Sequence, residues 1–502
     1  MDILSAGTRF APPPWSDDAP QRLDLQRRLD PDHLAHRIEQ AVPALDLSAF
    51  LRGYGRTGSL SHRPDLLLRA VLYEVQRGQH SPAQWHRDAR ESEPLRWLLR
   101  GCQPSRSVWY AFRDRIAPFV DDWNRQVLSQ AVAQGLTPAR RAALDGTLVA
   151  ANASRHKLVN ETTLAQRTEQ LAQASADDAA GAASPRPAWM AATLRGRRQQ
   201  QRRLQQAQQR MQALQQRNGG KRASKRKKPD QVRVSLSDPE AALGRDKEKV
   251  YRPLYNVQLL DDLDSPLVLA YDVLAQPNDA GVLGAMLQRQ AGLVGKRIEA
   301  LLADTAYAGG ADVAAAAAAK VTLYAPLPQE AEASQGKIPK SAFVWLPQEQ
   351  TYQCPQGQRL QYDKSSRHKR SGTETIALHQ YRCPAAYCMA CPQQQRCTSS
   401  PEKGRTISRS EYEEPIEALR QRMGTAQAKE LYRQRRQTVE LVNADWKEHR
   451  KLRRFSGRGL RRVGCQVGLM VLVHNGLTVL AARKKAAETA EAQAPVPKIT
   501  VA

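Results

Sequence analysis

The sequence predicts an α/β protein in which a mixed sheet is flanked by helices, with an all-helical domain before the sheet and two insertions within it. Three observations lead to this prediction. Residues 45–135 have helical periodicity throughout, whereas strand-like apolar runs alternate with helical patterns over residues 140–326. Two segments, 155–230 and 327–408, interrupt that alternation with different compositions. A chain of 502 residues that is 41% hydrophobic can form two or three domains with buried cores.

The N-terminal part divides into an extension and a helical domain. Residues 1–44 are punctuated by proline before they become helical, and we interpret them as the extension. In the domain at 45–135, Pro64 begins a segment whose apolar positions indicate a buried helical face. Further helices are predicted after the Ser-Pro pair at residue 81 and the Pro-Ser pair at residue 104.

The periodicity changes at Arg141, where residues 142–150 are typical of a buried strand with a glycine kink. Elements that follow outside the insertions are strands at 255–260, 267–273, 298–304 and 321–325, helices at 278–294 and 311–319, and only helices from 416. Residues 140–326 plus 409–483 therefore follow the element order of a ribonuclease-H-like catalytic core. Residues 484–502 are predicted to be a disordered tail.

The first insertion, 155–230, is rich in Ala, Gln and Arg and is predicted to be helical and basic. Residues 204, 207, 211 and 214 are apolar with heptad spacing, which favours a helical hairpin with a partner near residues 164–171. Residues 221–228 (KRASKRKK) are expected to form a flexible basic loop. The loop has two interpretations, a phosphate-binding segment or a solvated run of charge.

The charge balance points to a polyanionic partner. The chain has 76 Lys and Arg against 50 Asp and Glu, a net charge of +26. Because such an excess repels itself unless it is neutralised, nucleic acid is the leading candidate, with a merely soluble or ribosome-associated basic protein as the alternative. No run of 18 apolar residues and no secretory signal pattern is found, so neither a membrane partner nor export is expected.

Two acidic residues interrupt predicted strands. Asp145 lies in the run LDGT and Asp304 in the run LADT, each preceded by apolar residues. A carboxylate in a buried strand is costly unless it is paired or binds a metal, and strand ends that face a crevice are where α/β sheets bind ligands. The alternatives for each residue are a helix N-cap or an arginine-paired aspartate.

A third acid comes from a predicted helix. With Arg436 set at zero on a helical projection, Glu440 lies near 40°, Lys447 near 20° and Tyr432 near −40°, using about 100° per residue. The four side chains are therefore predicted to share one face. A surface pair between Arg436 and Glu440 is the simpler alternative. Three carboxylates from two strands and a helix suit hard divalent ions such as Mg²⁺, while Arg436 and Lys447 would meet phosphate oxygens.

The motifs together identify a resemblance. The segment 144–154 (LDGTLVAANAS) resembles the first catalytic segment of bacterial insertion-sequence transposases of the DDE type, and 303–307 (ADTAY) is similar to the second. Intervening motifs also resemble that family, at 235–241 (SLSDPEA), 255–258 (YNVQ) and 277–279 (PND). The helix with Glu440 resembles its Tyr/Arg/Glu/Lys signature. The resemblance covers about residues 45–482.

The resemblance implies a DNA transposase that binds the terminal inverted repeats of its element and target DNA, with residues 45–135 as the helical DNA-binding domain. It implies cleavage and joining of 3′ ends with two Mg²⁺ or Mn²⁺ ions. It assigns catalysis and metal binding to Asp145, Asp304 and Glu440, with Tyr432, Arg436 and Lys447 as the DNA phosphate-binding side chains of the same signature. Paired DNA ends imply a homodimer or larger assembly, and we expect a cytoplasmic, nucleoid-associated protein.

Two features depart from the signature. Three residues separate Tyr432 from Arg436 where the family usually has two, and Arg435 would restore that spacing but spoil the spacing to Glu440. In the family the segment after the glutamate often has an aromatic residue and a glycine, whereas here residues 441–446 are LVNADW. Asp445 and Glu448 are therefore rival candidates for the third acid.

The second insertion, 327–408, contains five of the seven cysteines. Cys354, Cys388, Cys391 and Cys397 have knuckle-like spacing, so we interpret them as ligands of a structural Zn²⁺ that holds together a segment with no core of its own. Cys383 is left as the spare thiol, and a set of reduced, unliganded thiols is the alternative. The resembling family commonly has similar cysteines here.

Three functions are compatible with the sequence. The first is an active transposase with two-metal, three-carboxylate chemistry. The second is a catalytically inactive or domesticated DNA-binding relative, and the third is a ribonuclease-H-like nuclease without strand transfer. The presence of all three acids favours the first, because no structural role requires all of them.

Overall fold

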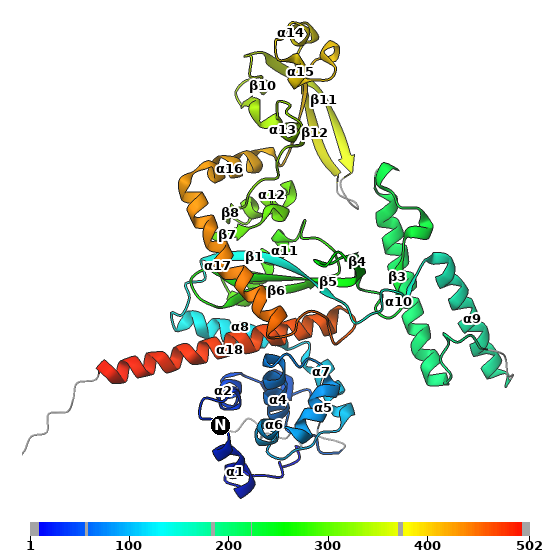
Figure 1. Ribbon diagram of the computed structural model, residues 1–502, viewed down its shortest axis with the longest axis vertical. Helices are drawn as coiled ribbons and strands as arrows, with labels where there is room; N and C mark the ends of the chain where they lie inside the picture. The colour runs from blue at the N-terminus through cyan, green and yellow to red at the C-terminus, as the bar shows by residue number, and fades with distance from the viewer. Residues whose placement is uncertain (1–9, 56–58, 182–185, 222, 370–374, 494–502) are drawn as a thin grey trace, which may run out of the picture.

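The computed structural model describes residues 10–55, 59–181, 186–221, 223–369 and 375–493. It is a mixed α/β protein with 51% helix and 16% strand, an N-terminal helical region and a mixed sheet, as predicted. Figure 1 shows the helical region at one end, the sheet in the middle, and the two insertions projecting from it in different directions.

The helical region begins earlier than predicted. Its helices are α1 (Pro20–Arg28), α2 (Leu34–Ala41), α3 (Ser48–Leu51), α4 (Pro64–Gln76), α5 (Pro82–Glu91), α6 (Glu93–Leu98), α7 (Arg106–Ile116) and α8 (Val120–Ala133). Ile38 of α2 is buried in the same core as Leu68 and Trp109. Residues 20–44, which we had interpreted as an extension, therefore pack as part of this region; apolar burial drives them there.

The central sheet has six strands. They are β1 (Arg141–Ala150), β4 (Ala242–Arg245), β5 (Tyr251–Asp262), β6 (Val268–Leu274), β7 (Ala300–Ala303) and β8 (Thr322–Tyr324). The order is β4-β5-β1-β7-β8, with β6 paired to β5. The pairs of β5 with β1, β4 and β6 are antiparallel, whereas β1–β7 and β7–β8 are parallel. The strand β1 is thus the centre of the sheet.

Helices cover the two faces of the sheet differently. On one face, Leu144 and Leu301 join the main core with α11 (Leu283–Val294) and α12 (Gly310–Ala318). On the other face, Ala143 and Leu302 form a small cluster with Val439 of α17 (Ala426–Glu448). Because side chains alternate along a strand, Asp145 lies on the face that α17 covers.

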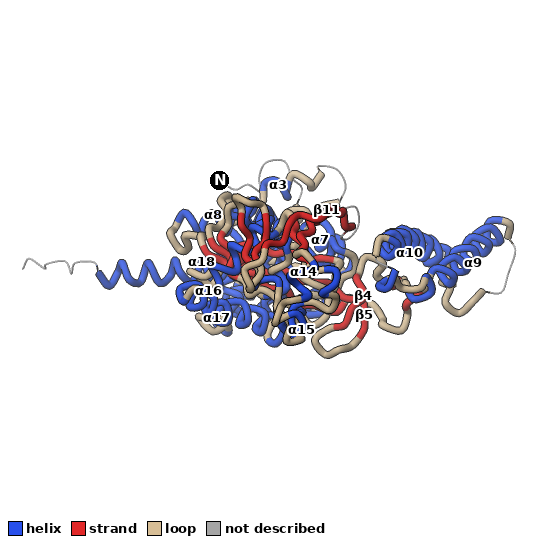
Figure 2. The backbone as a smooth tube through the Cα atoms, turned by 90° about the horizontal axis from the view of Figure 1, so that it is seen from above, coloured by secondary structure: helices blue, strands red, loops and turns tan. Residues whose placement is uncertain are grey.

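The first insertion forms the predicted helical hairpin. The helices α9 (Glu161–Ala179) and α10 (Leu194–Gly219) lie between two short paired strands, β2 (Leu158–Val159) and β3 (Val234–Ser235). The apolar residues expected to pair are in one separate cluster: Leu164, Leu171, Leu204, Ala207 and Met211, with Leu214 packed against it. Figures 1 and 2 show this hairpin projecting from the body as an arm. Residue 222 of the basic loop lies outside the described residues.

The second insertion is a five-stranded antiparallel sheet with short helices. Its elements are α13 (Ala331–Ser334), β9 (Val344–Leu346), β10 (Thr351–Gln353), β11 (Arg359–Lys369), β12 (Thr375–Arg382), α14 (Ala385–Met389), α15 (Gln394–Cys397) and β13 (Thr406–Ser410). Phe343, Tyr352 and Leu360 are buried in a core of its own. The expectation of a coreless segment was wrong, since cross-strand aromatic contacts, including Tyr352 with Tyr381, supply apolar burial here.

The chain ends in three helices, α16 (Glu413–Gly424), α17 and α18 (Leu460–Gln493). The tail predicted to be disordered from residue 484 instead continues α18 to Gln493, because alanine and charged residues there favour helix. Residues 494–502 lie outside the described residues. Residues 460–489 of α18 are long and apolar enough to span a membrane, but 67% of the most apolar window is buried inside the protein.

A buried acid in the helical region predicts a pH-dependent stability. Glu74 on α4 is 0% exposed, and burial together with Asp88 raises its pKa to about 8 against weaker opposition from Arg77. Between pH 4.5 and about 8 the folded state therefore holds a proton that the unfolded chain releases. The contribution of Glu74 to the free energy of unfolding is fully present below pH 4.5 and is lost as the pH rises through about 8.

Glu74→Gln keeps the size of the side chain and removes this titration. We expect thermal unfolding to show wild type losing about 2 kcal/mol or more relative to Glu74→Gln between about pH 5 and 9. Glu91→Gln, an exposed change on α5, is the control and should follow wild type. Parallel pH profiles for wild type and Glu74→Gln would contradict the prediction.

Candidate active site

Asp145 and Asp304 lie side by side at the centre of the sheet. The parallel register of β1 and β7 pairs Leu144 with Ala303, so the next residue on each strand is an aspartate. The negative charge of Asp304 acts on Asp145, which shows that the carboxyl groups are close. Asp304 also caps the following 3-10 turn, because its side chain accepts a hydrogen bond from the amide of Ala306 at 2.8 Å. Asp304 therefore acts as an N-cap, as the alternative interpretation expected, and its carboxylate still lies beside Asp145.

Both carboxylate oxygens of Asp145 are held from α17. The Arg435 guanidinium donates to Oδ1 at 2.8 Å and the Asn443 amide donates to Oδ2 at 2.8 Å. Burial raises the pKa of Asp145, the charge of Arg435 lowers it, and the charge of Asp304 raises it again. An arginine partner, the alternative interpretation of Asp145, is thus also present.

The helix α17 presents a different face from the one that we predicted. Arg435, Val439 and Asn443 face the sheet, which places the centre of that face about 100° from Glu440 on the helical projection. Glu440 and Arg436 are exposed. Within the described residues, no three Asp, Glu, His or Cys side chains are grouped closely enough to hold a metal ion. Glu440 as the third ligand stays a prediction.

Tyr432 and Lys447 lie at the rim of the site. Both are half-buried. The pKa of Tyr432 is raised by burial and by the charges of Asp304 and Asp145, while the charge of Asp145 acts on Lys447. Of the predicted helix residues, these two are near the aspartates.

Arg435 and Asn443 were missed as site residues by sequence reasoning. The sequence does contain an indication of Arg435, because two residues separate it from Tyr432, which is the spacing usual in the resembling family. For Asn443 the spacing of eight residues from Arg435, which is close to two helical turns, was the only indication.

Three of the recognised motifs meet behind Gly146. Gln258 on β5 pairs directly with Gly146. Its amide donates to Asp279 Oδ1 at 2.6 Å, and the hydroxyl of Tyr307 donates to Gln258 Oε1 at 2.5 Å. Asn256 also donates to Asp279 Oδ1, at 2.8 Å. This buried network joins YNVQ, PND and ADTAY, and it fixes the strands on either side of β1 relative to each other.

The motif SLSDPEA has a structural role. Asp238 Oδ1 accepts from the hydroxyl of Tyr255 at 2.8 Å and from the amide of Gly459 at 3.1 Å. Glu240 accepts from the amide of Leu460. These acids therefore cap the N-terminus of α18, where unpaired amides attract negative charge.

Asp261 is a further acid near the site that sequence reasoning missed. It lies opposite Ala143 on β5, on the same face as Asp145. Its carboxylate is fully buried, and neither oxygen has a hydrogen-bond partner within the described residues. Burial, followed by the charges of Asp145 and Asp262, raises its pKa well above the usual range. A run of apolar strand residues ending in two aspartates was the sequence signal.

Comparisons with known families agree with this geometry. A family model described as a Transposase DDE domain matches residues 353–480, and one described as a Transposase domain (DUF772) matches residues 23–115. The two matches together support an insertion-sequence transposase of the DDE type. No curated protein and no solved structure matches it. The first matched segment contains Glu440 and all five of the clustered cysteines, and the second contains most of the helical region.

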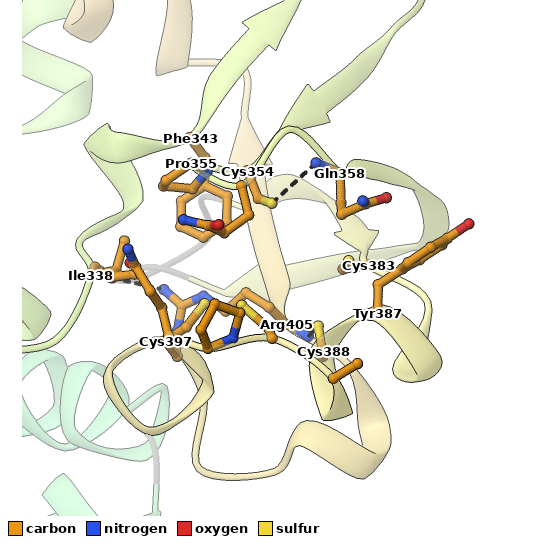
Figure 3. Close-up of a pocket in the computed structure, with 15 residues that line it drawn as sticks. Ile338, Phe343, Cys354, Pro355, Gln358, Cys383, Tyr387, Cys388, Cys397 and Arg405 are labelled. Carbon is orange, nitrogen blue, oxygen red and sulfur yellow. Dashed lines mark hydrogen bonds between the residues drawn. The ribbon is translucent and has the colours of Figure 1, made fainter.

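The fold brings all five clustered cysteines to one cavity of about 270 Å³. Figure 3 shows Cys354, Cys383, Cys388 and Cys397 around it, and Cys391 also lines it. Backbone amides donate to two of the sulfur atoms, from Gln358 to Cys354 and from Arg405 to Cys388, both at 3.3 Å.

Cys383 is not set apart from the four predicted ligands. Burial, followed by a hydrogen bond with Cys388, raises the pKa of its thiol to about 12. All five cysteines line the cavity, but within the described residues no three of them lie close enough together to hold a metal ion. All seven cysteines of the chain are free thiols.

Proposed function

We propose that this transposase binds the ends of its insertion sequence, cleaves the phosphodiester backbone and joins the 3′ ends to target DNA. The observation that supports this most is the pairing of Asp145 and Asp304 on adjacent parallel strands beneath a helix rich in arginine. Asp145 within β1 and Asp304 directly after β7 supply carboxylate oxygens, which are the ligands that Mg²⁺ or Mn²⁺ prefers.

We infer that the sheet is ribonuclease-H-like. Three antiparallel strands, β6, β5 and β1, are followed by the parallel strands β7 and β8, and this supports the element order predicted from the sequence. Because β1 and β7 are adjacent in this arrangement, Asp145 in β1 and Asp304 directly after β7 lie together.

The chemistry divides between the metal ions and the side chains. Two divalent ions, when bound, would activate the attacking oxygen and stabilise the leaving oxygen. Asp145 and Asp304 would hold them. For Glu440 to join these residues, α17 must turn by about 100° about its axis, which also withdraws Arg435 from Asp145. Arg435, Tyr432 and Lys447 would then be available to phosphate oxygens, with Arg436 beside them.

Further parts of the proposal concern partners and place of action. The net charge of +26 suits double-stranded DNA, and the helical region is proposed to contact the terminal inverted repeats. Joining two ends requires at least a dimer. We propose a cytoplasmic protein associated with the nucleoid.

A second candidate function is an inactive DNA-binding relative. The observations that favour it are the exposure of Glu440 and the neutralisation of Asp145 by Arg435. The same assay separates the two candidates.

The test incubates purified protein with DNA bearing the ends of its element and with Mg²⁺ or Mn²⁺. Nicked and joined products are resolved on denaturing gels, and binding is followed by fluorescence anisotropy. We expect products with either ion and none after chelation, with end binding retained. Binding without products under every metal condition would refute the proposed activity and leave the second candidate.

We propose that the cysteine cavity holds one structural Zn²⁺ through Cys354, Cys388, Cys391 and Cys397. The amide donors to Cys354 and Cys388 support this, because such hydrogen bonds stabilise thiolates. Metal analysis of protein purified without chelator should find about one Zn per chain. Cys391→Ser is expected to lower the zinc content sharply, whereas Cys383→Ser is expected to retain it. Protein free of zinc would refute the site, and loss of zinc only in Cys383→Ser would reassign the ligands.

A further inference from the structure

The arm has a strongly one-sided charge distribution. The helix α10 contains seven arginines and no Asp or Glu. Only Arg197 is buried, and it forms an ion pair with Asp178. On a helical projection the other six lie on the side opposite the apolar residues of the hairpin core, within about 140°. They are Arg195, Arg198, Arg202, Arg203, Arg210 and Arg217. Within the described residues, none of these six pairs with a carboxylate.

A second group of cations lies between this arm and the aspartates. The segment after α17 runs beside the end of β1, with Ala150 donating to the carbonyl of Arg453 at 3.3 Å and accepting from Phe455 at 2.9 Å. Arg458 donates to the carbonyl oxygen of Asn152 at 2.9 Å. The guanidinium of Arg454 similarly donates to Ala153 at 3.4 Å. The bonds of Arg454 and Arg458 use backbone acceptors, so they leave these two positive charges uncompensated, whereas the guanidinium of Arg453 forms an ion pair with Glu448.

The two groups are close enough to form one surface. The arm meets the segment through β3, because Leu204 of α10 is buried with Val234 of β3, and Asp238, which follows β3, accepts a hydrogen bond from the amide of Gly459. In agreement with this, burial and then the charge of Arg458 lower the pKa of Arg203. At the end of the surface near the aspartates, burial and the charges of Lys247 and Arg453 lower the pKa of Lys447, whereas the charge of Asp145 raises it. Positive side chains thus continue from the carboxylate site to α10. Arg210 also anchors the arm, because it donates to the carbonyl of Ala275 at 3.3 Å.

Like charges held together in this way are unfavourable unless a polyanion covers them. The length of α10, about 39 Å for 26 residues, is close to one turn of B-DNA, about 34 to 36 Å. Six arginines on one face match the backbone of a duplex, in which phosphates follow each strand at about 3.4 Å of rise.

We propose that the six-arginine face of α10 and the cations Lys247, Lys447, Arg453, Arg454 and Arg458 form one continuous DNA-backbone surface, which guides a duplex from the arm to the carboxylate site. This inference rests on the proposed function and adds to it the path of the DNA. The contacts are to phosphate, so the surface positions DNA without reading its sequence.

The test measures duplex binding over a range of salt concentrations. The arm variant is Arg195→Gln with Arg198→Gln and Arg202→Gln, and the segment variant is Arg454→Gln with Arg458→Gln. The matched control removes three exposed cations elsewhere, Lys296→Gln with Lys484→Gln and Lys485→Gln. Circular dichroism and thermal unfolding establish that each variant is folded, which is expected because glutamine is a good helix former.

The slope of log affinity against log salt should become shallower by about 2.7 in the arm variant and about 1.8 in the segment variant, if each side chain neutralises one phosphate. The control should keep the wild-type slope to within about 0.5. Hydroxyl-radical footprints of the arm variant should lose about one helical turn of protection at one end.

Several results would overturn the surface. An arm variant with the wild-type slope, or a control that changes as much as the arm variant, would do so. The proposal would also be overturned if the arm variant bound DNA as wild type does but no longer bound vesicles containing phosphatidylserine. The arginine face would then bind a membrane. Wild-type protein that binds no DNA at any salt concentration would overturn the proposed function as well, which separates the two failures.

Discussion

Asp145→Asn and Asp304→Asn, made singly, are expected to reduce strand cleavage and joining by about 10³-fold or more, with end binding unchanged. Each substitution removes a negative oxygen ligand from the centre of the site, and such ligands contribute several kcal/mol to the transition state. Stability should not fall at Asp145, because burial already disfavours its ionised form and asparagine can still accept from Arg435. Gel assays of nicked and joined DNA give the rates, and anisotropy gives the binding.

Glu430→Gln is the matched control for this series, since Glu430 is an exposed acid on the same helix as Glu440. It should retain wild-type activity. Glu440→Gln is expected to lose activity to the same extent as the aspartate variants. Full activity in Glu440→Gln, combined with loss in Asp445→Asn or Glu448→Gln, would transfer the role of third acid to one of those residues.

Gly146→Ala is expected to destabilise the protein by about 2 to 4 kcal/mol and to lower activity in whatever folded protein remains. A Cβ atom at this position would lie 2.0 Å from Asp279 Oδ1 and 2.4 Å from Gln258 Nε2. Asp279 cannot withdraw without breaking its hydrogen bonds to Gln258 and Asn256. The alternative is a shift of β1 itself, which would move the adjacent Asp145.

Gly292→Ala is the control, because a Cβ there meets nothing within 4 Å and the residue lies within α11. It should be neutral or stabilising by up to about 1 kcal/mol, since alanine is the better helix former. Urea unfolding of the two variants measures the difference. If both variants have the stability of wild type, Gly146 is not required by the network behind it.

Local patterns in the sequence determined a large part of this protein. The alternation of apolar runs predicted the strands, and the heptad positions Leu204, Ala207 and Met211 predicted the hairpin, because side-chain period and burial are properties of neighbouring residues. The acids at Asp145 and Asp304 stood out for the same reason: a charge within an apolar run is conspicuous in the sequence itself.

Only the tertiary structure decided which residues meet. The face that α17 turns toward the sheet depends on the packing of Val439 against Ala143 and Leu302, which are far away in the sequence. That packing brings Arg435 and Asn443 to Asp145 and leaves Glu440 exposed. A helical projection gives angles relative to the helix axis but not the direction of its partner.

The same limit applies to the buried polar groups. Asp238 and Asp279 belong to motifs of similar appearance, yet one caps α18 and the other closes the network behind Gly146. The proximity of Asp261 to Asp145 follows only from the pairing of β5 with β1. Hydrogen-bond partners across a sheet are set by strand register, and register is a property of the assembled fold rather than of either strand alone.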